Sequence, residues 1–193
     1  MKNPNRERGV GLIIVIMVVA FMLAVGLMLV TVTGTGPEVA ANVYLQDQAF
    51  NAAEAGFDRA WYQLEANYIA SGWVSFDGHY VTTPAGIDNP IDPNFYQTLT
   101  DVQLLALLDQ NNDGSPDDPN VIFFKQPYVI GPSGSIDNKY TFTAFLIDDE
   151  AGGGQPNPLD TLLICIGTVQ HGDTIATARL MIELEAEVSG TNP

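Results

Sequence analysis

The stretch VGLIIVIMVVAFMLAVGLMLVTV, residues 10–32, decides the organisation of this chain, because its 23 residues contain no charged side chain. A helix rises about 1.5 Å per residue, so this stretch is long enough to cross the ~30 Å hydrocarbon core of a membrane. A conventional secretory signal has an apolar region of only about 7–15 residues. On hydropathy alone, the segment therefore predicts a membrane-spanning helix that acts as an uncleaved signal anchor.

The charges around this segment predict its orientation and exclude one class of function. The chain has 23 acidic and 7 basic residues and a formal net charge of −16. Lys2, Arg6 and Arg8 precede the apolar segment, and the next basic residue is Arg59. The positive-inside tendency then places the N-terminus in the cytoplasm and the remainder of the chain outside it. After Gly9 only four basic residues accompany 22 acidic ones, so we expect no basic surface for nucleic acid.

The leader MKNPNRERG, residues 1–9, ends in glycine directly before the apolar segment. This arrangement resembles the cleavage signal of type IV prepilins and of type II secretion pseudopilins. The resemblance implies that a membrane peptidase cuts after Gly9 and that the new amino terminus, Val10, is methylated. Major pilins have glutamate at the fifth residue after the cut, whereas this chain has Ile14. PilX-like minor pilins and K-type pseudopilins share this absence of the glutamate. Such subunits sit at or near filament tips.

A second motif, QAFNAAEAGFDRAWYQLE at residues 48–65, extends the resemblance, since PilX-like minor pilins have a similar stretch at this distance from the leader. The resemblance implies a structural subunit of a type IV pilus or a secretion pseudopilus. Its partners would be other pilin or pseudopilin subunits, the inner-membrane assembly machinery and, before assembly, membrane lipid. The alternative is a single-span surface binding protein, stabilised by calcium, whose leader is never cut. The leader would cover residues 1–9, the transmembrane helix 10–32, the second half of the long helix 33–70 and the exported domain 71–193.

A weak point is expected between the two halves of this helix. The segment TGTGPE, residues 33–38, contains Gly34, Gly36 and Pro37. Each glycine costs about 1 kcal/mol relative to alanine in a helix, and proline clashes with the carbonyl four residues earlier. We expect the helix to loosen or break there, as a hinge or as a plain juxtamembrane linker.

The pattern becomes helical again from residue 38 to about 69. Apolar side chains recur every seven residues, which predicts an amphipathic helix with one apolar stripe: Val43, Phe50, Phe57 and Leu64. The intervening turns of the stripe are filled by Val39, Ala53, Ala60 or Trp61, and Tyr68. The stripe could form a coiled-coil seam, but a single helix of this kind usually packs on its own domain, which is the reading we favour.

The remainder of the chain predicts an α+β domain. Residues 72–101 are rich in Gly, Pro, Asn and Asp, which indicates an irregular loop with one short strand. A short helix is expected at 101–109, with Asp101 as its cap. Strands are expected at 121–124, 127–130, 139–147, 161–169 and 174–188, with a tight hairpin at QHGD, residues 170–173. The long helix would pack on this antiparallel sheet. Cys165 lies in an apolar run, so we expect a buried structural thiol.

The segment DQNNDGSPDDPN, residues 109–120, has the alternation of oxygen ligands that a calcium loop requires. Side-chain oxygen ligands are expected from Asp109, Asn111, Asp113 and Asp117. At the seventh position the main-chain carbonyl of Ser115 is expected to be the ligand. Gly114 stands at the sixth position, where the loop turns sharply, but the twelfth is Asn120 rather than glutamate. We expect an extracellular type of calcium loop here, and the alternative is an acidic surface turn built from Asx motifs.

Other candidate sites are weak. His79 and His171 are the only histidines, and neither has a paired histidine or cysteine at metal spacing, so both are expected to face solvent. An acidic cluster follows the strand expected at 139–147: Asp148, Asp149 and Glu150. Such a cluster is more typical of a solvated loop than of a second ion site. We find no phosphate-binding loop, dinucleotide fingerprint or catalytic triad, and we expect that the protein is not an enzyme.

Overall fold

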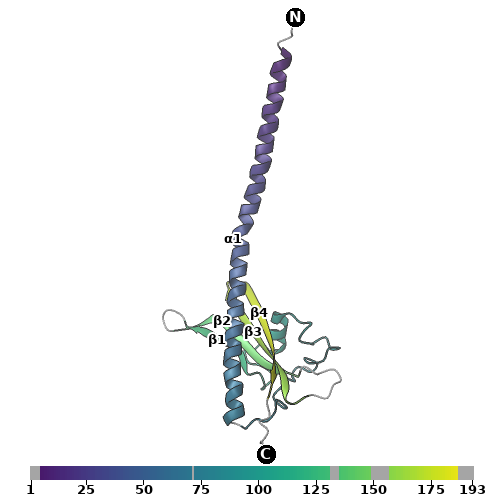
Figure 1. Ribbon diagram of the computed structural model, residues 1–193, viewed down its shortest axis with the longest axis vertical. Coiled ribbons are helices and arrows are strands. Elements are labelled where there is room, and N and C mark those ends of the chain that lie inside the picture. Colours follow the sequence, from purple (N-terminus) through teal and green to yellow (C-terminus); the bar gives the residue numbers. More distant parts are fainter. Residues whose placement is uncertain (1–4, 71, 131–134, 149–156, 187–193) are drawn as a thin grey trace, which may run out of the picture. The chain divides into compact units, whose positions relative to one another are not determined.

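The structure is a computed structural model that describes residues 5–70, 72–130, 135–148 and 157–186. It contains two helices, α1 (Asn5–Ala70) and α2 (Asp101–Leu107). The four strands are β1 (Phe123–Ile130), β2 (Ile136–Ile147), β3 (Asp160–His171) and β4 (Thr174–Glu185). Figure 1 shows the order of these elements along the chain. The predicted α+β class, a long N-terminal helix followed by an antiparallel sheet, is confirmed.

The chain divides into two compact units, Met1–Tyr44 and Leu45–Pro193. The first consists of the apolar part of α1. The second contains the rest of α1, α2 and the sheet. The helical assignment of α1 continues through Pro37, so the expected break is not seen in the backbone. A proline inside a helix removes one hydrogen bond and can bend the helix without ending it. Whether the segment is flexible stays a prediction.

The sheet is an antiparallel meander in the order β1-β2-β3-β4, as the sequence predicts. Its two expected N-terminal strands, 121–124 and 127–130, are one strand, β1, interrupted by a bulge. The hairpin between β3 and β4 closes with His171 opposite Thr174, and Gly172 in the turn has a φ of +60°. A glycine adopts that conformation without steric cost, which explains the tight turn.

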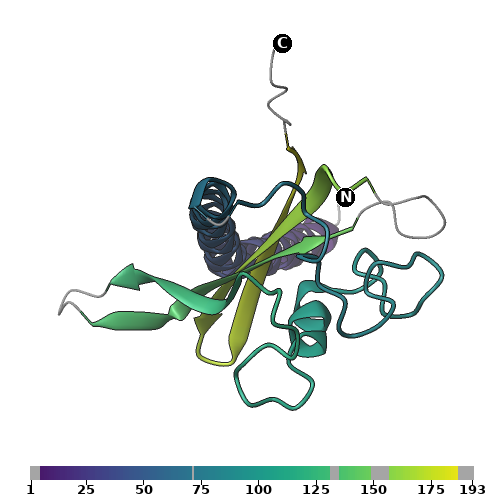
Figure 2. The ribbon, with the colours of Figure 1, turned by 90° about the horizontal axis from the view of Figure 1, so that it is seen from below.

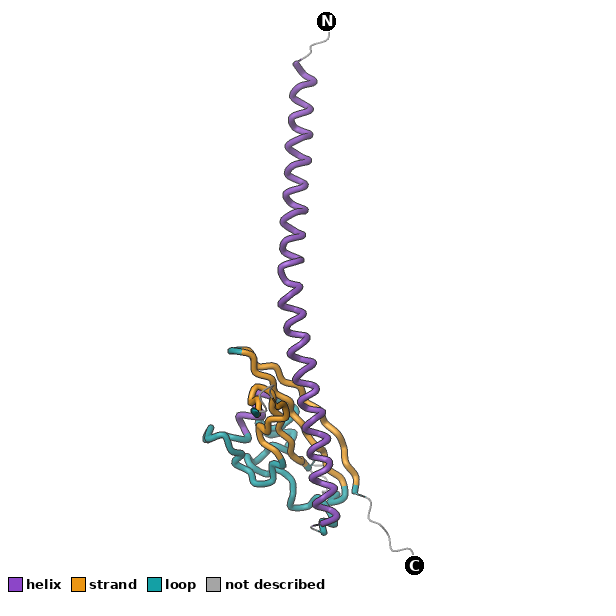
Figure 3. Tube along the Cα trace, turned by 90° about the vertical axis from the view of Figure 1, so that its left-hand side faces the viewer, coloured by secondary structure: helices purple, strands orange, loops and turns teal. Residues whose placement is uncertain are grey.

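The two faces of the sheet bury different parts of the second unit. The C-terminal part of α1 covers one face, and α2 with the long loop covers the opposite face (Figures 2 and 3). Alternation of side chains along each strand produces this division. On β2, Phe145 and Ile147 point to the α2 side, whereas Ala144 and Leu146 point to the α1 side.

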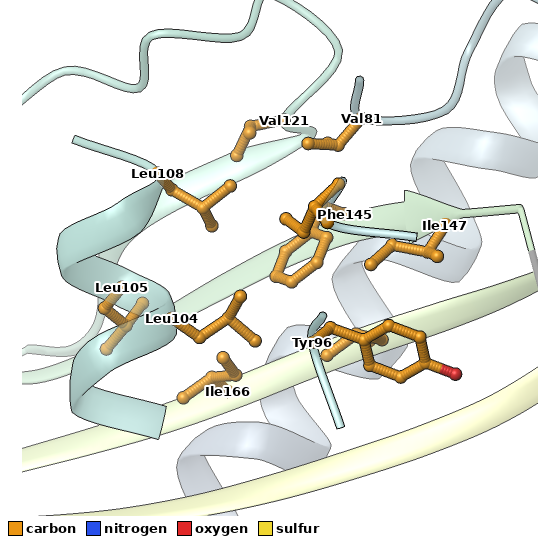
Figure 4. Packing of buried hydrophobic residues seen from close by; sticks show 11 residues of the cluster. Val81, Tyr96, Leu104, Leu105, Leu108, Val121, Phe145, Ile147 and Ile166 are labelled. Atoms are coloured by element: carbon orange, nitrogen blue, oxygen red, sulfur yellow. The ribbon is translucent and has the colours of Figure 1, made fainter. Parts of the chain in front are cut away.

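The core under α2 is tightly packed. Leu104 of α2 and Leu108, the residue that follows its last turn, are fully buried against Phe145 and Ile166 of the sheet (Figure 4). The cap of α2 is Thr100, whose hydroxyl accepts from Gln103 N, and not Asp101 as the sequence suggested. Thr100 and Gln103 form a capping box, in which the Gln103 side chain also accepts from the Thr100 backbone.

The described part of the long loop, residues 72–100, contains no strand, so the short strand expected there is absent from it. Arg179 of β4 holds the end of this loop by donating to Asp101 Oδ1 at 2.7 Å and to two backbone carbonyls, those of Tyr96 and Leu99. A buried carboxylate, Asp118, holds its beginning by accepting from the backbone N–H groups of Thr82 and Thr83 at 2.8 and 2.7 Å. An irregular loop is thus fixed by charge-assisted hydrogen bonds.

Candidate functional site

The apolar part of α1 forms the first candidate site. Its large side chains from Leu12 to Val30 are all exposed, none by less than the 41% of Val25. By length and composition this is a helix that could cross a membrane. Such a continuous apolar surface is not stable in water, so lipid or other protein must cover it. The predicted processing residues Gly9 and Val10 lie within α1 as the structure assigns it, and no contact described here tests their role.

The second part of α1 packs on the sheet through small residues. Ala49, Ala52, Ala53 and Ala60 are fully buried. A Cβ atom built on Gly167 of β3 would overlap the Ala49 carbonyl oxygen and the Ala53 nitrogen of the helix. The helix backbone therefore lies directly on the sheet backbone at this point. The alanines of the AAEA motif provide the close approach, because larger side chains would hold the two elements apart.

This packing corrects the predicted apolar stripe. Val43 and Phe50 are exposed by 55% and 44%, Phe57 is only half-buried, and Leu64 alone of the four is buried. The predicted stripe is thus correct only in part: Ala53, Ala60 and Leu64 are buried against the sheet domain, whereas the large N-terminal members of the stripe are not. The helix does pack on its own domain, as predicted.

The acidic loop, residues 109–120, is the second candidate site. It is closed by its own hydrogen bonds: Asp113 N donates to Asp109 Oδ1 at 3.0 Å and to Asn111 Oδ1 at 2.9 Å. Ser115 N donates to Asp113 Oδ1 at 2.8 Å, and Gln110 N donates to Asp117 Oδ2 at 2.7 Å. Gly114 has a φ of +86°, which is the sharp turn expected at this position.

Several of these acceptor oxygens are also ones that a calcium ion would need, and one of them has a cationic neighbour. Asp109, the first predicted ligand, is buried, and its Oδ2 lies 3.2 Å from Lys125 Nζ. Among the described residues, no group of three or more His, Cys, Asp or Glu side chains could hold a metal ion. Lys125 Nζ lies at the Asp109 oxygen that a calcium ion would bind, so calcium would have to displace this ammonium group, and calcium binding by the loop stays a prediction.

Lys125 is a residue that the sequence reasoning missed. It lies in the β1 bulge, where three residue steps on β1 are opposite two on β2, and its φ is +44°. This conformation costs an L-residue roughly 1–2 kcal/mol. Its backbone N donates to Thr143 Oγ1 at 3.0 Å, and Nζ lies 4.6 Å from the centre of the Phe124 ring. The sequence offered one indication that Lys125 matters, namely that it is one of only four basic residues after Gly9.

The remaining candidates are structural. Cys165 is fully buried, and burial raises the pKa of its thiol to about 12, so the predicted inert thiol is confirmed. His79 is not fully solvent-facing, because its ring stacks on Trp73 at 3.5 Å between centroids. Burial lowers the pKa of His79, and nearby Asp77 partly opposes that shift. His171 is exposed, as expected. Of the predicted acidic cluster at 148–150, residues 149 and 150 lie outside the described part of the chain.

Comparison with known proteins adds one finding. Residues 8–58 match the family model described as PilX N-terminal. The match includes the processing residues, the apolar segment and the AAEA motif, and it confirms the resemblance of this part of the chain to PilX-like type IV pilins. Neither a curated protein nor a solved structure matches the chain significantly.

Proposed function

We propose, from the similarity of residues 8–58 to the PilX N-terminal family, that this chain is a minor pilin or pseudopilin that helps to assemble a type IV pilus or a related filament. That match is the observation that carries the proposal. The exposed apolar helix and the α+β unit support it, because they supply an anchor and a displayed domain. The role is structural and not enzymatic.

The sequence suggests how such a subunit is prepared. Cleavage after Gly9 would remove Lys2, Arg6 and Arg8 and leave an amino terminus at Val10, ahead of a wholly uncharged segment. The apolar side chains would be covered first by lipid in the inner membrane and then by the helices of neighbouring subunits. The N-terminus would start in the cytoplasm and the sheet domain on the opposite side of the membrane.

Ile14 favours a position at or near the filament tip. A glutamate at this place would offer a carboxylate to the amino terminus of a neighbouring subunit, and isoleucine cannot form that ion pair. A subunit in the shaft has neighbours on both sides, whereas a terminal subunit needs fewer such contacts.

The test is the N-terminus of the mature chain. With a prepilin peptidase present, mass spectrometry should find Val10 first and methylated, and Gly9→Leu should leave the precursor intact. Gly11→Leu is the matched control, because a Cβ atom at Gly11 meets no atom within 4 Å and the substitution leaves both residues of the cut bond unchanged. An intact Met1 in isolated filaments would contradict the proposal. If the precursor is never cut and never enters filaments, the chain is the alternative, a single-span surface protein.

Calcium binding by residues 109–120 is a separate proposal that rests on the ligand spacing alone. Calcium would have to compete with Lys125 for Asp109. Its test is therefore a comparison with and without this lysine.

A further inference from the structure

A groove of about 640 Å³ lies on the α2 side of the sheet, beyond the end of the packed core. Val102 and Ala106 of α2 line one wall, and the loop residues Asp109 and Gln110 continue it. The floor is formed by polar side chains of the two central strands, Thr141 and Thr168 among them, which lie directly opposite each other. The same sheet face is therefore apolar under the core and polar here. Grooves of this volume suit a small ligand.

The charge of this groove differs from that of the chain. Two of the four basic residues that follow Gly9, Lys125 and Lys139, line it, and Asp109 is its one acidic residue. The groove thus has a formal charge of +1 on a chain of −16. Within the described residues, the Lys139 ammonium forms no ion pair, although Asp137 Oδ1 accepts from the Lys139 backbone N at 3.0 Å, whereas the Arg179 guanidinium is paired with Asp101. An anionic group would meet attraction here and repulsion over most of the remaining surface.

The lysine at the bulge is held in position by the protein. Its side chain is 43% exposed, but that of Asp109, which it contacts, is only 1% exposed. The buried carboxylate and the Phe124 ring fix the ammonium group at the groove wall. An ammonium group has three donors, and Asp109 uses one. Strained residues such as this one, with a φ of +44°, persist where the surroundings hold them, often at ligand sites.

The lining favours a hydroxyl-rich ligand over a peptide. The central strands β2 and β3 are hydrogen-bonded on both sides, so an added peptide strand cannot pair with them at the floor. The groove instead offers exposed amides and half-buried hydroxyls, which suit sugar hydroxyl groups: Gln110, Asn112, Asn138, Thr141, Thr168 and Gln170. Ile175 adds an apolar surface for a sugar face.

We infer that this groove binds an acidic saccharide of the uronic acid type, with a carboxylate between Lys125 and Lys139 and the sugar hydroxyls on the amides and threonines. In this inference the acidic loop, residues 109–120, has a structural function at the groove, because the carboxylate of Asp109 positions Lys125. This inference is independent of whether the chain enters a filament.

The experiment is isothermal titration of the full chain in detergent micelles at 0.15 M salt with trigalacturonate. Binding should be seen, and Lys139→Gln should weaken it about tenfold or more, as expected for loss of a hydrogen bond to a charged group. Arg59→Gln is the matched control, because it removes the same charge from α1, away from the groove, and should leave the affinity unchanged. The uncharged methyl ester of the trisaccharide should bind at least tenfold more weakly than the acid.

Lys125 is tested with its partner, so that no buried carboxylate is left without a cation. The double variant Lys125→Gln with Asp109→Asn should also lose binding while its far-ultraviolet circular dichroism stays that of the parent chain. If this variant does not fold, the Lys139→Gln result decides. No binding, equal binding of the methyl ester, an equal loss in Arg59→Gln, or tighter binding of tetraglutamate would each overturn the inference, the last in favour of an acidic peptide.

Discussion

Gly167 is the most sensitive contact between α1 and the sheet. Alanine at this position adds one Cβ atom, which would overlap the backbone of Ala49 and Ala53 and approach the Ala52 side chain. Backbone atoms of a helix cannot move away by a change of rotamer. Gly167→Ala therefore requires α1 to shift away from β3, and it tests whether the small residues of the AAEA motif are there for close packing.

The size of the effect follows from overpacking. Adding a methyl group to a well-packed core typically costs about 1–3 kcal/mol, and occasionally more. The overlapped atoms belong to the backbone, and the shift also loosens three fully buried alanines, Ala49, Ala52 and Ala53. We expect the upper end, about 3 kcal/mol. For a chain of this length each kcal/mol lowers the Tm by roughly 2–4 °C, so a decrease of about 6–12 °C is expected.

Thermal unfolding of the full chain in detergent micelles, followed by tryptophan fluorescence, measures this effect. Both tryptophans, Trp61 and Trp73, belong to the unit that contains the sheet.

Two other glycine-to-alanine substitutions serve as comparisons for the decrease in Tm of Gly167→Ala. Gly56→Ala should cost less than Gly167→Ala, because its Cβ would lie 3.0 Å from Phe142 atoms, a milder overlap than the one between a Cβ on Gly167 and the Ala49 carbonyl oxygen. Gly36→Ala meets nothing within 4 Å and should leave this transition unchanged. The smallest decrease in Tm that we expect for Gly167→Ala is about 6 °C. A Tm within about 1 °C of that of the parent chain would therefore refute the close-packing argument.

Three further predictions concern other parts of the molecule. The thiol of the buried Cys165 has a pKa raised to about 12, so little thiolate is present at pH 8. A thiol reagent should therefore react at least about a thousandfold more slowly with the folded chain than with the chain in denaturant. Equal rates would show that the thiol is accessible. Hydrogen exchange across residues 33–38 should be faster than in the flanking turns, and Pro37→Ala should remove the difference; uniform protection in the parent chain would exclude a hinge. Millimolar calcium should raise the Tm of Lys125→Gln more than that of the parent chain, because the variant frees Asp109 Oδ2; if both respond equally, or neither does, the loop does not bind calcium through Asp109.

Local sequence patterns predicted the elements of this fold well. Apolar alternation identified the strands, and the QHGD turn identified the β3–β4 hairpin because a glycine beside an aspartate favours a tight turn. The short helix was found from its spacing, but its cap was assigned one residue too late. Thr100 and Asp101 are both good capping residues, and only the partner of Asp101, Arg179 from the distant strand β4, shows why the aspartate is used elsewhere.

The candidate sites were less predictable, because they depend on residues that are far apart in the chain. Spacing alone suggested that Asp109 is a calcium ligand, yet a bulge in β1 brings an ammonium group to the same oxygen. The bulge has no signal in the sequence around Lys125, since it results from the register between β1 and β2. The groove is equally hidden, because its lining comes from α2, the acidic loop and all four strands.

The sequence by itself determined the long apolar segment, the resemblance of the N-terminal part to pilins, the α+β class and the order of the strands. These properties depend on neighbours along the chain, where composition and periodicity act directly. Only the tertiary structure decided that Ala49, Ala52 and Ala53 face the sheet in place of Val43 and Phe50, because the close contact with Gly167 has room for small residues only. It also decided that Asp109 holds Lys125, since a buried carboxylate takes the cation that the folded chain brings within reach.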